Sequence, residues 1–148
     1  MMDFNGMIKE FSLVYPELKD VKLKIIKNDD YIGACNSVYY GEFFYIGKMR
    51  YKMQKTDSIF LTENDKNIML SFLHEIAHAI TPYYERKVKN IWIRMDHSDK
   101  FYKNFFDIVS LAYQKKFITK MISMSELKKQ DEYKRNILND RVKYIKKI

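Results

Sequence analysis

Residues 70–84 read LSFLHEIAHAITPYY, and the pattern HExxH lies inside this stretch, from His74 to His78. Residues four apart lie on the same face of an α-helix, so the two imidazoles can point at one ion while Glu75 lies beside them. Imidazole nitrogens are common zinc ligands, and a neighbouring carboxylate can take a proton from water. The stretch therefore indicates a zinc site of the kind that activates water for hydrolysis.

The apolar residues around this pattern predict the helix that it needs. Thr62 or Asn64 is expected to cap the start of the helix, and Pro82 is expected to end or kink it just past the histidines. Apolar side chains at helical spacing centre on the face opposite the two imidazoles. These residues are Ile68, Met69, Phe72, Leu73, Ile76 and Ile80.

A catalytic zinc ion usually has three protein ligands and one position open to water, so a third ligand is expected farther along the chain. The metzincin pattern is excluded, because Thr81 and Tyr84 stand where it requires glycine and histidine. A glutamate on a following helix is also hard to find, since Glu126 is the next glutamate after Glu85.

His97 is the remaining histidine and the expected third ligand. Ser98 is placed to cap a second helix, which would hold His97 at its start. Asp96 and Asp99 are alternative ligands, or acceptors that orient an imidazole, and a solvated loop position for His97 stays open. The second helix is predicted from the spacing of Phe101, Phe105, Ile108, Val109 and Ala112.

The sequences HEIAHA at residues 74–79 and DHSDKF at 96–101 resemble the SprT-like and WLM-type zinc metallopeptidases. In these families HExxH is followed by a later histidine with an aromatic residue four positions on, and the likeness covers about residues 58–117. It implies zinc on His74, His78 and His97, with Glu75 as catalytic base, and some family members act on proteins attached to DNA. Glycine often flanks the third histidine there, and a cysteine-rich zinc ribbon is common. This chain has neither feature.

The whole chain, residues 1–148, is expected to form one zincin-like α+β domain, with a small antiparallel sheet packed against the HExxH helix and further helices. Strands are predicted near 21–25, 31–40, 43–52 and 58–61, with a turn at 56–58. Residues 83–95 are expected to be a connection that places Trp92 in the core. Ser123 and Glu126 have capping-box spacing and predict a basic amphipathic helix over 123–148.

The charge and cysteine content set the expected partners and compartment. The chain has 27 Lys and Arg against 19 Asp and Glu, a net charge of +8, which makes DNA a candidate partner. Cys35, the single cysteine, is expected in a strand and suits a reducing compartment. No secretory signal or membrane-spanning run is found, so we expect a soluble cytoplasmic protein without a membrane partner.

These patterns predict a zinc-dependent metallopeptidase that hydrolyses protein or peptide substrates, including DNA-associated proteins, with Glu75 as the base. Tyr83, Tyr84 and Tyr102 are candidate donors to the oxyanion. One alternative is a DNA-binding accessory protein with a structural zinc or an inactive peptidase fold. Others are an interaction module without metal and a zinc hydrolase acting on a different bond.

Overall fold

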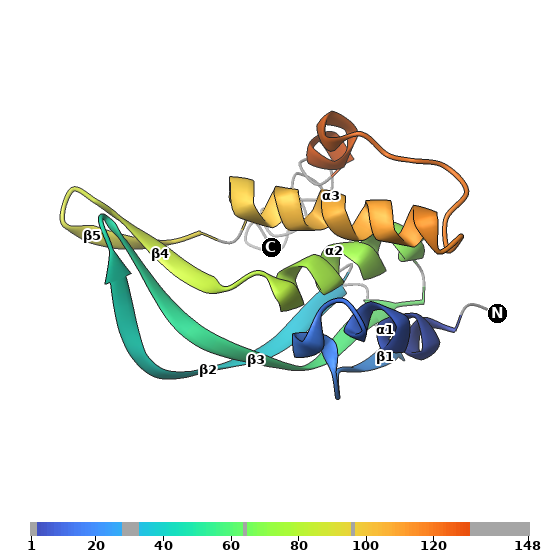
Figure 1. Cartoon of the computed structure of the whole chain (residues 1–148), viewed down its shortest axis with the longest axis horizontal. Helices are drawn as coiled ribbons and strands as arrows, with labels where there is room; N and C mark the ends of the chain where they lie inside the picture. Colours follow the sequence, from blue (N-terminus) through green and yellow to red (C-terminus); the bar gives the residue numbers. More distant parts are fainter. Residues whose placement is uncertain (1–2, 28–32, 64, 96, 131–148) are drawn as a thin grey trace, which may run out of the picture.

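The computed structural model describes residues 3–27, 33–63, 65–95 and 97–130. Figure 1 shows the arrangement of the helices and strands. Residues 124–130 are also helical. The elements are α1 (Phe4–Ser12), the 3-10 helix η1 (Pro16–Leu18), β1 (Lys22–Ile26), β2 (Gly33–Ile46), β3 (Met49–Thr62), α2 (Ile68–Ile80), β4 (Tyr83–Val88), β5 (Ile91–Arg94) and α3 (Asp99–Gln114).

The sheet is mixed and is built around β3. β2 runs antiparallel to β3 along one side, while β1 and β4 occupy opposite ends of its other side. β1 is parallel to β3, and β5 extends the sheet antiparallel to β4. The α+β class is therefore confirmed, but the expectation of a wholly antiparallel sheet is wrong. β1 and β2 lie on opposite sides of β3 and do not pair with each other. The chain runs back along β2 and turns again into β3, so β3 has the same direction as β1.

Two predicted strand boundaries are wrong. The chain turns at Gly47 and Lys48, so the strand expected at 43–52 is divided between the end of β2 and the start of β3. Residues 56–58 do not turn, and β3 continues through them into the strand expected at 58–61. Instead the pairing register shifts opposite Asn36 and Ser37, which absorbs an extra residue as a bulge. Gly41 likewise sits inside β2 with φ of 77°, a conformation that glycine adopts without steric cost. The predicted start of this strand, residues 31 and 32, lies outside the described residues.

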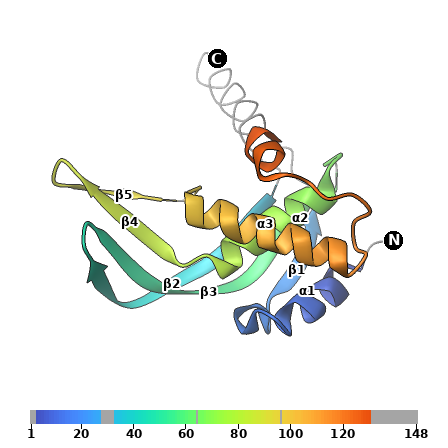
Figure 2. The ribbon, with the colours of Figure 1, turned by 45° about the horizontal axis from the view of Figure 1, so that its top comes forward.

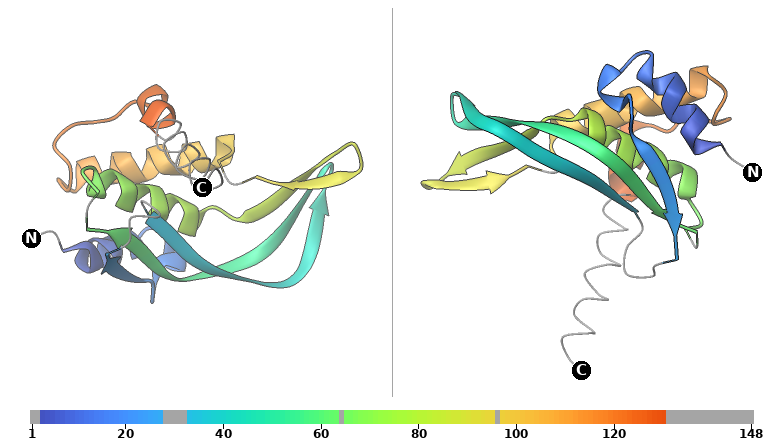
Figure 3. Two further views of the ribbon diagram at one scale, coloured as in Figure 1. Left: turned by 180° about the vertical axis from the view of Figure 1, so that it is seen from behind. Right: turned by 90° about the horizontal axis from the view of Figure 1, so that it is seen from below.

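Strands β4 and β5 were not predicted. They form a hairpin through Lys89 and Asn90, whose φ angles of 51° and 66° suit a two-residue turn that follows the twist of the strands. Trp92 lies on this hairpin and is partly exposed, so its expected place in the core is wrong. The β2–β3 and β4–β5 hairpins extend past the helices in the same direction, away from α1 (Figure 3).

Helix α2 lies between the sheet and α3 (Figures 1 and 2). It is buried on more than the one face that the apolar spacing predicted, because Ala77 and Ala79 pack against neighbours as well. The α3 prediction is confirmed, since all five of its expected core residues are buried. The largest fully buried side chains are Phe11, Leu18, Ile59, Leu61, Phe72, Leu73, Ile76, Phe101, Phe105, Ile108, Val109 and Leu127.

The start of α2 differs from the prediction. Asn67 is its N-cap residue, whereas Thr62 still belongs to β3 and residue 64 lies outside the described residues. The Asp65 carboxylate accepts hydrogen bonds from the backbone N–H of Asn67, at 2.9 Å, and from the hydroxyl of Ser71. The predicted end is confirmed, because α2 stops at Ile80, two residues before Pro82.

The last described segment follows the predicted capping pattern at its start. The Glu126 N–H donates to Ser123 Oγ at 3.2 Å, and Leu127 is fully buried. The rest of the basic helix predicted over 123–148 lies outside the described residues from 131 onward. Among the described helices, none combines the length and apolar character needed to cross a bilayer.

Candidate metal centre

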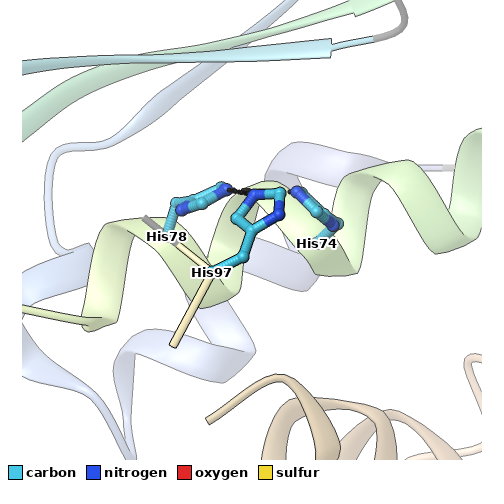
Figure 4. A group of neighbouring side chains, drawn as sticks. All are labelled: His74, His78 and His97. Carbon is cyan, nitrogen blue, oxygen red and sulfur yellow. Dashed lines mark hydrogen bonds between the residues drawn. The ribbon is translucent and has the colours of Figure 1, made fainter. Parts of the chain in front are cut away.

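Three histidines from two parts of the chain meet at one point (Figure 4). His74 and His78 project from consecutive turns of α2, and His97 lies just before α3, whose N-cap is Ser98. The Nε2 atom of His78 is 3.1 Å from Nε2 of His74 and 3.1 Å from Nε2 of His97. One ligand atom from each of the three lies within 4.8 Å of the others. The fold therefore brings together the three histidines expected from the sequence.

The spacing of these nitrogens fits a bound cation. Three imidazoles on a tetrahedral zinc ion, with Zn–N bonds near 2.05 Å, have nitrogens about 3.3 Å apart. Hydrogen bonding among the rings fits less well, because one imidazole nitrogen carries either one N–H or one lone pair. His78 Nε2 therefore cannot form a well-aligned hydrogen bond with both of its neighbours. A cation accepts electron density from all three nitrogens at once, so the donor set suits zinc.

A single phenylalanine backs all three imidazoles. The Phe101 ring stacks on His97 at 4.8 Å and on His78 at 4.3 Å, and it meets His74 edge-on at 5.0 Å between ring centroids. Phe101 is fully buried and follows His97 by four residues at the start of α3. Phe105 adds a second edge contact to His74 at 5.3 Å. These contacts restrict the imidazoles to orientations in which their Nε2 atoms converge.

The three histidines are partly exposed, whereas Glu75 is buried with 7% of its surface accessible. Partial exposure leaves room for a fourth ligand from solvent, as catalytic zinc sites require. Asp99 is exposed and is not part of the cluster among the described residues. Asp96, the other alternative ligand, lies outside the described residues.

The C-terminal end of α2, which carries His78, is tied to two other elements. Gln54 of β3 donates from Nε2 to the carbonyl oxygens of His78, at 3.1 Å, and Thr81, at 2.7 Å. Asn104 of α3 donates to the Thr81 hydroxyl at 3.0 Å, and that hydroxyl donates to the Ala77 carbonyl. These bonds satisfy carbonyls that a helix end would leave without partners. Sequence reasoning missed Gln54 and Asn104, because no local pattern connects them to α2.

The candidate oxyanion donors have different surroundings. Tyr83 donates to Glu85 Oε1 at 2.7 Å, and burial together with this carboxylate raises the pKa of Tyr83 to about 12. Tyr84 is buried and stacks on Tyr51, with ring centroids 5.4 Å apart. Tyr102 places its ring 6.3 Å from that of His97, so this tyrosine is the one of the three with a ring contact to the cluster in the described residues.

Cys35 lies in β2, as expected. Burial raises the pKa of the Cys35 thiol, and the nearby Glu75 carboxylate raises it further, while hydrogen bonds with Ser37 and Thr56 oppose the change.

A scan against protein-family models, a search of curated proteins and a search of solved structures each found no match to this chain.

Proposed function

We propose that the chain is a zinc-dependent metallopeptidase with a zincin-like fold, similar to the SprT-like and WLM-type enzymes, that hydrolyses protein or peptide substrates. The observation that carries this proposal is the convergence of the His74, His78 and His97 nitrogens beside the Glu75 that shares their helix. Three neutral nitrogen ligands with an adjacent carboxylate are suited to activating water, and a peptide bond is the bond that HExxH sites most often attack.

The chemistry divides between the ion and the chain. A zinc ion held by the three histidines would supply Lewis acidity to a water molecule and to the substrate carbonyl. Glu75 accepts the proton of the attacking water at a carboxylate oxygen and passes it to the nitrogen of the leaving amine. Its burial keeps bulk water from competing for the same carboxylate. The histidines and Phe101 hold the geometry in which these transfers take place.

The test combines metal content with peptide cleavage. Purified wild-type chain, Glu75→Gln, His97→Ala and Asp99→Ala are supplied with zinc, checked for folding by circular dichroism, and analysed for zinc per chain. Unfolded proteins and peptide mixtures then serve as substrates, with products read by mass spectrometry. We expect about one zinc in wild type, Glu75→Gln and Asp99→Ala, a clear loss in His97→Ala, and cleavage only by wild type and Asp99→Ala.

Each contrary result removes a defined part of the proposal. A folded wild type that takes up no zinc would exclude a metallopeptidase. Zinc loss in Asp99→Ala but not in His97→Ala would replace the third ligand. Undiminished cleavage by Glu75→Gln would remove Glu75 as the base. Bound zinc without cleavage of any substrate would favour the alternative of a structural zinc in an accessory protein.

A further inference from the structure

The two hairpin turns lie side by side at one end of the molecule, remote from α1 (Figure 3). β3 pairs with β4 in this region, from Met49 opposite Arg86 to Lys52 opposite Tyr83, and the Lys87 N–H donates to the Lys48 carbonyl at 2.8 Å. We call residues 45–49 and 87–92 the arm tip. Both turns have two residues and paired flanks, so the arm tip is a braced projection of the sheet.

The arm tip exposes large apolar side chains that lie outside the hydrophobic core. Ile46 is 63% exposed and Ile91 is 64% exposed, and Val88 is exposed beside them. The aromatic residues Tyr45 and Trp92 lie one position farther from the turns and contact each other, with ring centroids 5.9 Å apart. If the arm tip entered a bilayer, its aliphatic extremity would lie deepest, and the tyrosine and tryptophan directly behind it would lie at the interface, where these residues are enriched.

The charged residues of the arm tip are all basic. Lys48, Lys87 and Lys89 are exposed there, and no acidic residue occurs at its positions in the sequence. The larger arm, residues 38–53 and 83–94, has seven Lys and Arg against two Glu. Lysines beside a shallow apolar surface are attracted to the negative surface potential of anionic lipids. Within each hairpin, the backbone groups that face the partner strand are also hydrogen-bonded, which lowers their cost near an apolar phase.

We propose that the arm tip is a membrane-docking surface, which inserts Ile46, Val88 and Ile91 into the interfacial region of an anionic lipid bilayer. Tyr45 and Trp92 lie at the level of the headgroups, and the three lysines contact lipid phosphates. This surface is separate from the metal centre and requires no membrane-spanning segment. It differs from the sequence-based expectation of no membrane partner, which considered spanning segments and signals alone.

Single-stranded nucleic acid is the competing partner for a basic and aromatic surface, because bases stack on open rings. Here the rings of Trp92 and Phe43 already contact cations. The Arg50 guanidinium lies 4.4 Å from the Trp92 ring centroid and 4.1 Å from that of Phe43, and the Lys87 ammonium lies 5.8 Å from Trp92. Two of the three most exposed apolar side chains of the arm tip, Ile46 and Ile91, are aliphatic and offer no face for stacking, while the third is Tyr45. These features favour a bilayer over a nucleic acid.

Trp92 is the only tryptophan in the chain, so its fluorescence reports on the arm tip without a label. Full-length protein is titrated with vesicles of phosphatidylcholine alone and with vesicles containing phosphatidylglycerol, and binding is also measured by co-sedimentation. We expect a blue shift and co-sedimentation with the anionic vesicles, weakened by salt, and little of either with the neutral vesicles.

Variants separate the two components of binding. Ile46→Ser with Ile91→Ser should weaken partitioning about tenfold or more by removing apolar contact. Lys48→Glu with Lys89→Glu should weaken it at least tenfold, since each lysine near an anionic surface contributes about fivefold. Leu13→Ser, at a residue 77% exposed on the end of α1, and Lys19→Glu are the matched controls and should bind as wild type does.

The same assays can overturn the proposal. Equal loss in the control variants, or no blue shift with anionic vesicles, would exclude insertion of the arm tip. Binding of a single-stranded oligonucleotide that quenches Trp92, depends on Lys48 and Lys89, and is unaffected by the isoleucine changes would assign the surface to nucleic acid. Glu75→Gln should bind vesicles as wild type does, so failure of the peptidase proposal leaves this test intact.

Discussion

The substitution Phe101→Leu tests whether contacts with the three histidines affect metal binding independently of core packing. Phe101 contacts the rings of His74, His78 and His97 at 4.3–5.0 Å and is fully buried. Leucine keeps the site apolar but removes the flat face that stacks on the imidazoles. If each released imidazole costs about 0.5 kcal/mol to order again upon metal binding, three rings cost about 1.5 kcal/mol. This corresponds to a roughly tenfold weaker zinc affinity.

The matched control is Phe72→Leu. Phe72 is also fully buried, but its ring contacts are with Phe4 and Phe11 on α1. Both substitutions remove similar volume from the core, and each should lower the free energy of unfolding of the metal-free protein by about 1 kcal/mol. Only Phe101→Leu should also weaken zinc binding.

The assay measures zinc affinity by competition with a chelator, and stability by urea denaturation of the metal-free chain. The expected result is equal destabilisation of the two variants with about a tenfold difference in zinc dissociation constant between them. Equal zinc affinity in both variants, at equal stability, would refute the argument that Phe101 orients the histidines. Weaker zinc binding by Phe72→Leu would show that affinity follows general stability instead of the ring contacts.

Two further predictions follow from bonds elsewhere in the fold. Gln54→Ala should lower the free energy of unfolding by about 1–3 kcal/mol in urea denaturation, because the Thr81 carbonyl loses the Gln54 donor and the His78 carbonyl keeps only the Thr81 N–H, whereas an unchanged midpoint would contradict this role. Tyr83 should ionise only near pH 12 in an ultraviolet difference titration against Tyr83→Phe, and Glu85→Gln should lower this pKa by removing the negative charge beside the phenol. A Tyr83 titration that is unaffected by Glu85→Gln would show that burial alone raises the pKa.

The helices of the site could be predicted because their signals are local. The apolar spacing, Ser98 and Pro82 act within one or two helical turns, and the structure has α2 ending before Pro82 and α3 capped by Ser98. The Ser98 hydroxyl accepts from the Phe101 N–H at 3.2 Å, as an N-cap should. His97 directly precedes this cap, so its position at the start of α3 could be predicted although it is far from α2 in the sequence.

The sheet was harder to predict because its signals compete with tertiary contacts. Residues 56–58 have the composition of a turn, but Thr56 and Ser58 are buried, and the Thr56 hydroxyl bonds with that of Ser37 at 2.9 Å. Burial and pairing therefore override the local preference for a turn. Lys89 is an unusual residue for positive φ, so the β4–β5 turn had only Asn90 as a signal. The parallel pairing of β1 with β3 joins segments that no local pattern relates.

The candidate metal centre is built on a hydrophobic core that forms without an ion. Phe72, Leu73 and Ile76 share α2 with two of the histidines and are fully buried, and each contributes about 2 kcal/mol by leaving water. His78 Nε2 lies 3.1 Å from Nε2 of both His74 and His97 and can form a well-aligned hydrogen bond with only one of them, so holding this arrangement costs on the order of 1–3 kcal/mol. The burial term is larger, so the helices hold the ligands in place before a cation binds. In small zinc modules the metal supplies the folding energy. Here the folding energy of the core would preorganise the three histidines for a cation, which would favour tight binding with one position left open to solvent.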